Sequence, residues 1–217
     1  MALTSLQMMH LADSALPVGG FAFSNGLEAA VKCGLVASQV DLERYLESAL
    51  RQWIAFEGPF LHLFYTHGSE EIFMRYDRMM LSPSMRKASF ALGRGWNRVL
   101  KDLFPETDPQ SFQTQLKDVG LGPHYLILMT ATLKATGAEE DQIRALYLFT
   151  LLRDQCSAAV RLGLIGPSGA QALQSRLEKR LGSALEESVA DVPQRFTPLM
   201  DLAQMLPPSL YTKLFQN

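Results

Sequence analysis

Apolar residues recur at spacings of three and four along most of the chain, a pattern that predicts amphipathic helices. The clearest helix begins at Ser38, because Ser38 and Asp41 have the spacing of a capping box. The apolar positions that follow are Leu42, Tyr45, Leu46, Ala49, Leu50 and Trp53. They share one helix face, so we expect this helix to pack on a core and to break near Gly58-Pro59.

Further helical patterns are separated by turn residues. They cover residues 70–81, 84–104, 123–136 and 139–165, and another helix opens with a capping box at Ser168. A polar connector around residues 105–110 joins two of them. Alternating strand patterns are nearly absent. The sequence therefore predicts an all-α protein, a single-domain bundle of roughly eight to ten helices.

Two segments depart from this pattern, one near each end. Residues 11–28, LADSALPVGGFAFSNGLE, form a loop rich in Pro, Gly and Phe. Near the other end, Pro207 and Pro208 separate a final apolar and basic segment from the preceding chain. We therefore divide the chain into a helical domain, residues 1–208, and a C-terminal partner-docking tail, residues 209–217.

Composition narrows the function classes. The chain has 217 residues, 47% of them hydrophobic, and a formal net charge of -2, so it offers no global attraction to nucleic acid or anionic membranes. Its two cysteines have no metal-ligand or disulfide spacing. Neither a signal peptide nor a membrane span is recognisable, so we expect a cytoplasmic protein.

One local charge bias stands out. Residues 84–104 contain five basic side chains and one acidic, and four of the basic ones fall close to one helix face. These are Arg86, Arg94, Arg98 and Lys101. A solvated face is the more common explanation of such a stripe, and a docking surface for an acidic partner is the alternative.

No catalytic or metal-binding motif is recognisable. His62 and His67 are five residues apart and would diverge on a helix, and no HExxH or Cys/His ligand spacing occurs. The segment GLIGPSGAQ at 163–171 lacks the lysine of a phosphate-binding loop. We therefore expect no catalytic residues and no metal ligands: a non-enzymatic binding or scaffold protein.

The opening loop closely resembles the N-terminal signature of the urease accessory protein F family, S-x-ALP-x-G-x-F-x-x-S-x-GLE. The matching positions are Ser14, Ala15, Leu16, Pro17, Gly19, Phe21, Ser24, Gly26, Leu27 and Glu28. Residues 84–93, residues 157–174 (SAAVRLGLIGPSGAQALQ) and the closing YTKLFQN resemble three further family elements in the same order. Mild departures occur at Phe23, Lys213 and Asn217.

This resemblance implies an all-α accessory chaperone of urease maturation. Such a protein forms a homodimer and bridges a scaffold accessory protein, D or H, and a GTPase accessory protein, G, for nickel insertion into apo-urease. Nucleotide chemistry then belongs to the GTPase, and nickel is handled transiently within the complex, with no cofactor bound tightly. A helical adaptor of the same fold with partners other than urease is the alternative function.

The resemblance and the charge stripe together single out partner-binding residues. They are Pro17, Gly19, Gly20, Phe21, Ser24, Glu28, Arg86, Arg94, Arg98, Arg161, Tyr211, Lys213, Leu214 and Phe215. Phe21 has a second interpretation as a plug of its own core, and Glu28 and Arg161 as structural ion-pair or capping residues. We expect the tail to form a short helix as it docks and to be dispensable for folding, with docking on its own chain as the alternative.

Overall fold

The computed structural model describes residues 3–186, 192–206 and 212–216, without the side chains of residues 181 and 183–186. Within these ranges the chain is helical and contains no strand, as the sequence predicts. The α-helices are α1 (Ser5–Leu11), α2 (Leu27–Lys32), α3 (Gln39–Ala55), α4 (Glu57–Thr66), α5 (Glu70–Met79), α6 (Pro83–Leu103), α7 (Pro109–Asp118), α8 (Tyr125–Ala135), α9 (Glu140–Arg161), α10 (Pro167–Glu186) and α11 (Pro198–Met205). Two 3-10 turns, η1 (Gly20–Ala22) and η2 (Pro105–Thr107), complete the order.

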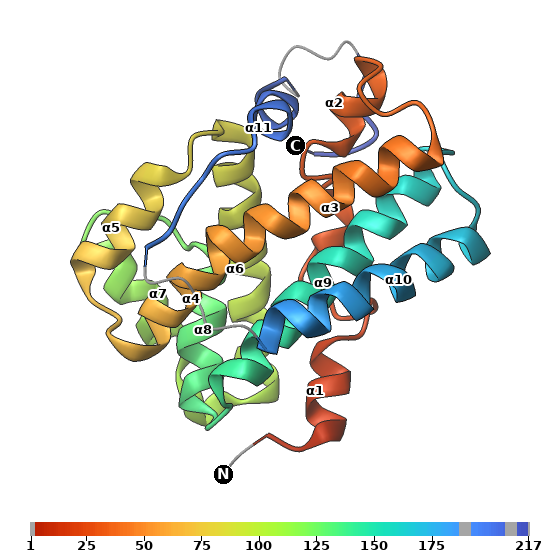
Figure 1. Cartoon of the computed structure of the whole chain (residues 1–217). Helices are drawn as coiled ribbons and strands as arrows, with labels where there is room; N and C mark the ends of the chain where they lie inside the picture. The colour runs from red at the N-terminus through yellow and green to blue at the C-terminus, as the bar shows by residue number, and fades with distance from the viewer. Residues whose placement is uncertain (1–2, 187–191, 207–211, 217) are drawn as a thin grey trace.

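The helices form two groups that share the long helices α3 and α9 (Figure 1). On one side, α6 packs along α8, and α4 and α5 lie beside them; on the other, α10 packs along α9. The α6–α8 pair is close because Gly93 has no side chain: a Cβ there would lie 1.9 Å from the Pro123 carbonyl oxygen. Any larger residue would therefore separate these two helices.

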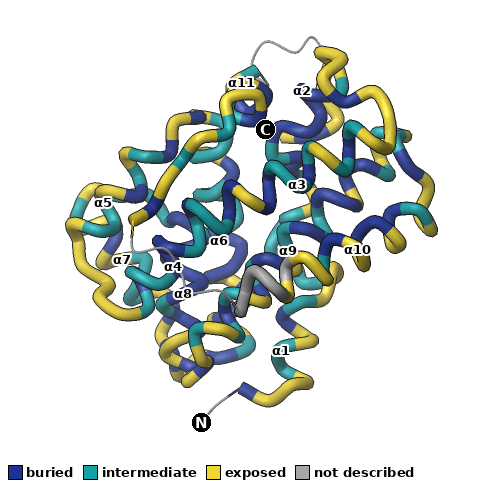
Figure 2. Tube along the Cα trace, in the orientation of Figure 1, coloured by how far each residue is buried: buried dark blue, intermediate teal, exposed yellow. Residues whose placement is uncertain are grey.

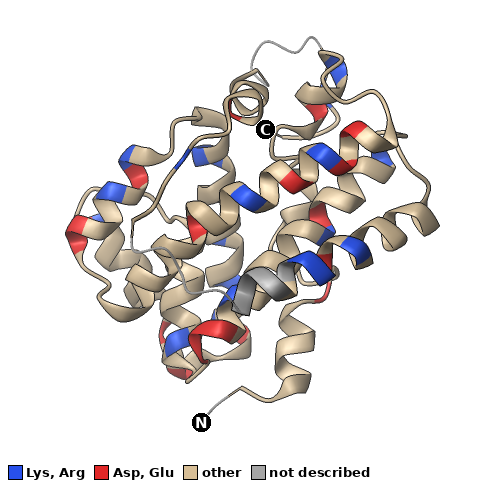
Figure 3. Cartoon of the chain, in the orientation of Figure 1, with Lys and Arg blue, Asp and Glu red and all other residues tan. Residues whose placement is uncertain are grey.

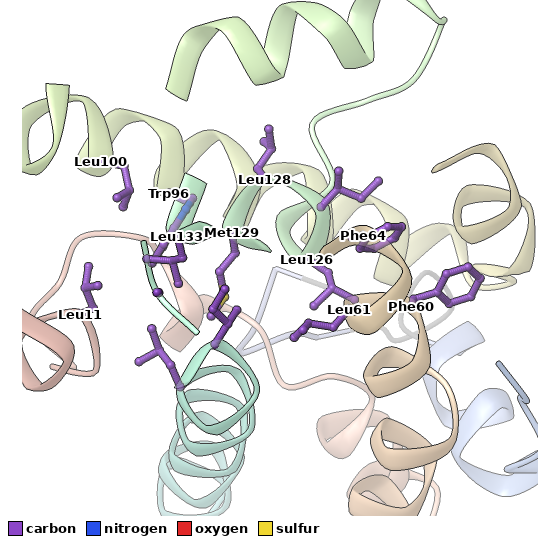
Figure 4. Packing of buried hydrophobic residues seen from close by; sticks show 14 of the residues in the cluster. Leu11, Phe60, Leu61, Phe64, Trp96, Leu100, Leu126, Leu128, Met129 and Leu133 are labelled. Atoms are coloured by element: carbon purple, nitrogen blue, oxygen red, sulfur yellow. The ribbon is translucent and has the colours of Figure 1, made fainter. Parts of the chain in front are cut away.

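The buried side chains follow the same division (Figure 2). One cluster lies mainly among α4, α5, α6 and α8, and Figure 4 shows Trp96, Leu100, Leu128 and Phe60 within it. The second joins α2, α3, α9 and α10 and includes Phe215 of the tail. Tyr147 packs against both clusters, so α9 connects the two halves of the core.

Local sequence explains where most helices begin and end. Ser38 accepts the Asp41 amide at the start of α3, and Ser82 accepts the Met85 amide at the start of α6. The predicted break falls at Phe56, between α3 and α4, and Pro59 lies in the first turn of α4, where its missing amide is tolerated. Hydrophobic periodicity therefore located the long helices correctly.

Other details of the sequence prediction were wrong. Helix α10 begins at Pro167, so Ser168 lies inside its first turn and does not cap it, and α9 ends at Arg161, short of the expected 165. We did not predict the short helices α1, α2, α7 and α11. Such short helices have few turns over which a period can be recognised, and tertiary contacts decide them.

Candidate functional site: a junction between the two ends of the chain

The opening loop is held in place by glycines that allow close backbone approach. Gly19 has φ +98°, in the left-handed region, and starts the 3-10 turn η1. At Gly20, a Cβ would lie 2.1 Å from an Asp154 carboxylate oxygen on α9. The loop therefore lies directly on α9, and a side chain at position 20 would displace the Asp154 carboxylate.

The two phenylalanines of this loop have opposite environments. Phe23 is 6% exposed and packs in the interior, whereas Phe21 is 64% exposed. Phe21 therefore does not fill the core of its own chain. Its ring remains available for contact with another protein, as the interpretation as an interface anchor requires. An aromatic ring this exposed adds no core packing to its own chain but can bury a large area against another protein.

Ser24 connects the loop to α2 and α9. Its hydroxyl oxygen accepts the Glu28 amide at 3.3 Å, and its carbonyl accepts the Gln155 side-chain amide at 2.9 Å. Gly26 follows with φ +93°, and its lack of a Cβ leaves space for Gln204 of α11. These contacts orient α2 so that Glu28 points toward the C-terminal segment.

Glu28 is the centre of the junction. Its carboxylate is buried and accepts the Leu214 amide at 2.6 Å and the Phe215 amide at 3.2 Å. Lys32, one helical turn away, forms a 2.9 Å ion pair with the same carboxylate and also donates to the Thr212 carbonyl. The Gln216 amide donates to the Ala22 carbonyl at 2.9 Å. The loop and α2 therefore hold the last described residues by four separate contacts.

Arg161, the last residue of α9, also contacts the tail at this junction. Its guanidinium lies over the Phe215 ring, 4.2 Å from the ring centroid, in cation–π geometry. Phe215 itself is 4% exposed and belongs to the core cluster of α2, α3, α9 and α10. The opening loop, the end of α9 and the tail, far apart in sequence, thus meet at one place beside α2 (Figure 1).

The described part of the tail follows the alternative of docking on its own chain. Residues 212–216 form no helix in the unbound chain, and Phe215 is buried against α2, α3, α9 and α10. Leu214, 59% exposed, and Lys213 remain at the surface. Tyr211 lies outside the described residues. Partner binding by this segment stays a prediction.

The four residues of the basic stripe on α6 lie in two different environments. Arg86 forms an ion pair with Asp77 and donates to the carbonyls of Asp77 and Met80, at 2.7 and 3.1 Å. Arg94 and Lys101 are exposed, and so is Arg98, which donates to the Pro17 carbonyl at 3.1 Å. Arg86 therefore has an internal structural role, whereas the other three face solvent. Figure 3 shows that residues of both signs are interspersed over the visible face of the molecule.

Arg86 belongs to a partly buried chain of polar side chains that sequence reasoning missed. His124 donates through Nε2 to Asp77 at 2.9 Å, and its Nδ1 accepts from the Ser89 hydroxyl at 3.1 Å. Burial lowers the pKa of His124, which favours this neutral tautomer. Burial raises the pKa of Asp77, but hydrogen bonds from His124 and Arg86 outweigh it and bring the pKa below its usual value. The chain connects α5, α6 and the start of α8.

Sequence reasoning also missed Lys32 and Asp154 at the junction. Lys32 follows Glu28 by four residues, and this ion-pair spacing was the available signal. Asp154 contacts the loop at Gly20 only through tertiary structure, so no local pattern indicates it.

Neither a metal-ligand cluster nor a membrane-spanning helix occurs in the described part of the chain. There, no group of three or more His, Cys, Asp or Glu side chains is arranged to hold a metal ion. None of its helices has the length and apolar character to cross a bilayer. The absence of a resident metal ligand set remains an expectation for the full chain.

The fold and the junction define an all-α protein whose signature loop holds its own C-terminal segment and leaves Phe21 and Leu214 exposed beside it. The family model described as UreF matches residues 36–178. Urease accessory protein F of Arabidopsis thaliana is 30% identical over 218 residues, covering 95% of this chain and 90% of its own length. Urease accessory protein UreF of Azoarcus sp. (strain BH72) is 29% identical over 224 residues, covering 98% and 95%. The chain belongs to the urease accessory protein F family.

Proposed function

We propose that this protein is a non-enzymatic accessory chaperone of urease maturation. It acts as a homodimer in the cytoplasm and bridges the scaffold accessory protein, D or H, and the GTPase accessory protein, G. Nickel is the cargo of the assembly and is inserted into apo-urease. The observation that carries the proposal is the similarity along nearly the whole chain to relatives named urease accessory protein F.

The junction supports a binding role for the signature residues. Phe21 and Leu214 are both largely exposed, and they lie on neighbouring segments because the Gln216 amide bonds to the Ala22 carbonyl. Exposed apolar side chains on a fixed backbone suit a protein interface, since little conformational entropy is lost when they are covered. Lys213 and the exposed α6 residues Arg94 and Arg98 supply charge at the rim of such an interface.

Co-purification tests the bridging role. The tagged protein is expressed with the candidate scaffold, with and without the GTPase, and urease activation by added nickel is measured in the same cells. We expect Phe21→Ala combined with Leu214→Ala to reduce scaffold recovery and activation, because both anchors are truncated. The matched control is Val40→Ala, which truncates an exposed side chain at the start of α3.

Two outcomes would contradict the proposal. Wild-type protein that recovers neither partner and does not support activation would favour an adaptor with other partners. A double variant that binds and activates like the control would move the interface away from the junction.

A further inference from the structure

A cavity of about 160 Å³ lies between the two halves of the core. It is lined from α3, α4, α5, α6, α8 and α9, and by the segment that contains Arg195 and Gln204. Its aromatic lining residues are Phe21, Phe23, Tyr45, Trp53, Tyr76, Trp96, Tyr125 and Tyr147. A cavity of this size has room for on the order of ten water molecules or for a small organic molecule.

Two oxygen atoms of the lining residues lack a hydrogen-bond donor within the described chain. They are Oε2 of Glu57, at the first residue of α4, and Oε1 of Gln155, on α9. Gln155 is 1% exposed, and its Nε2 donates to the Ser24 carbonyl, which fixes the opposite end of the amide as an acceptor. A buried acceptor without a donor costs about 1 to 3 kcal/mol, so each of these atoms calls for an N–H or O–H group.

Among the charged residues that line the cavity, only Glu57 and Asp13 lack an ion pair in the described part of the chain. Arg153 pairs with Asp154 at 2.7 Å, and Arg195 pairs with Asp201 at 2.7 Å. The remaining acidic lining residue, Asp13, is exposed and accepts the Ala15 amide. Glu57 has no ion-pair partner in the described part of the chain.

We propose that this cavity binds a small organic cation, a protonated primary amine whose N–H groups donate to Glu57 and Gln155. The carboxylate supplies the opposite charge, and the tyrosine and tryptophan faces provide the aromatic environment that attracts ammonium groups. An ammonium group needs only such acceptors and faces. A divalent metal ion requires more carboxylate, imidazole or thiolate ligands than the described residues bring together here.

Binding should depend on pH. Burial raises the pKa of Glu57 to about 7, and the Arg195 and Asp201 charges lower and raise it in turn. The other titratable groups that face Glu57 are the hydroxyls of Tyr76 on α5 and Tyr147 on α9, whose pKa values burial raises above their usual value. Glu57 therefore ionises near neutral pH, and its ionised form is the one that binds a cation. Burial also raises the pKa of Asp154, a second carboxylate of the lining, which pairs with Arg153.

The test uses the purified full-length chain and n-propylammonium chloride as the probe, with n-propanol as a neutral probe of similar size. The chain has two tryptophans, and both line the cavity, so their fluorescence reports occupancy directly. We expect saturable binding of propylammonium with at least tenfold weaker binding of propanol. Affinity should fall about tenfold between pH 8 and pH 6, because the ionised fraction of Glu57 falls by that factor while the amine stays protonated.

Glu57→Gln removes the charge and keeps the size of the side chain, and we expect it to weaken propylammonium binding at least tenfold. Glu106→Gln, at an exposed position on η2, is the matched control and should bind like the wild type. Three results would each overturn the proposal and leave water as the occupant. They are equal binding of the two probes, no fluorescence change when propylammonium is added to the wild type, and unchanged propylammonium affinity in Glu57→Gln. If Glu57→Gln failed to fold, the pH dependence in the wild type would decide.

Discussion

Two glutamates of this chain, Glu28 and Glu57, behave differently because different groups surround their carboxylates. Glu28 is buried, yet its charge is compensated by Lys32 and by two backbone amides of the tail. A buried carboxylate with this many donors is stable, and removal of the carboxylate would leave the donors unsatisfied. Glu57, by contrast, has a carboxylate oxygen without a hydrogen-bond donor, and burial raises its pKa.

Replacement of Glu28 tests its role as the hydrogen-bond acceptor that holds the tail. Glu28→Ala should lower the free energy of unfolding by about 2 to 3 kcal/mol, because the Leu214 and Phe215 amides lose their acceptor. Glu28→Gln keeps one acceptor oxygen and should lose less. Urea denaturation measures the stability, and hydrogen exchange measures protection of the two amides. Unchanged protection in Glu28→Ala would show that other contacts hold the tail.

Glu57 should make stability depend on pH. Its pKa in the folded protein is about 7, above the ordinary value of 4.5 that it has when unfolded. As pH rises from 4.5 to 7 the unfolded state loses its proton first, so the folded state binds more protons and stability falls. The stability gained by Glu57→Gln over wild type should therefore grow across this window, by up to about 3 kcal/mol, and level off above pH 7. Glu106→Gln should show a difference that does not vary with pH.

At the scale of elements, three of the helices begin where a serine side chain accepts one of the first free amides. Ser38, Ser69 and Ser82 cap α3, α5 and α6 in this way. Three solvent-accessible ion pairs also link α3 to α10, from Arg176 and Arg180 on α10 to Glu43 and Glu47 on α3. Such exposed pairs contribute little to stability, so caps and buried faces decide the placement of these helices.

Ser38→Ala should lower the free energy of unfolding by about 1 kcal/mol, because the Asp41 amide loses its acceptor. Ser48→Ala, inside the same helix, is the control and should have little effect or stabilise slightly, since alanine is the better helix former. Thermal denaturation of both variants measures the difference. Equal stabilities would show that water replaces the cap.

The exposed part of the basic stripe should matter for association and not for folding. Arg94→Glu should weaken binding to the proposed assembly of scaffold and GTPase at low salt, with a change in unfolding free energy below about 0.5 kcal/mol. Arg75→Glu makes the same charge change at an exposed site on α5 and is the control. Binding by Arg94→Glu equal to that of the control would identify the stripe as an ordinary solvated face.

At the scale of the whole molecule, the C-terminal segment completes the core cluster of α2, α3, α9 and α10. Phe215 from the tail lies in the cluster with residues of α2, α3, α9 and α10, and Arg161 covers its ring. The tail is thus part of the fold up to Phe215, while Leu214 faces outward. Binding of a partner at Leu214 would therefore act on a segment whose position the core already sets.

Deletion of residues 212–217 should destabilise the protein, which revises the expectation that the tail is dispensable for folding. Loss of Phe215 burial alone should lower the free energy of unfolding by about 1.5 to 3 kcal/mol. For a chain of this length, each kcal/mol lowers Tm by roughly 2 to 4 °C. Leu214→Ala is the control, since this exposed side chain should leave Tm unchanged. Equal Tm values for the truncation and the wild type would contradict the burial of Phe215.

Hydrophobic periodicity by itself determined the helical class and the positions of α3, α5, α6, α8 and α9, because a face of a long helix repeats often enough to be recognised locally. The signature residues indicated the family and named Glu28, Arg161 and Phe215 as important. Only the tertiary structure brought these three together and buried Phe215, exposed Phe21 and paired Arg86 with Asp77. Each of these outcomes depends on how different elements of the fold pack together, and the free energy of such contacts is set by the whole fold and not by local sequence.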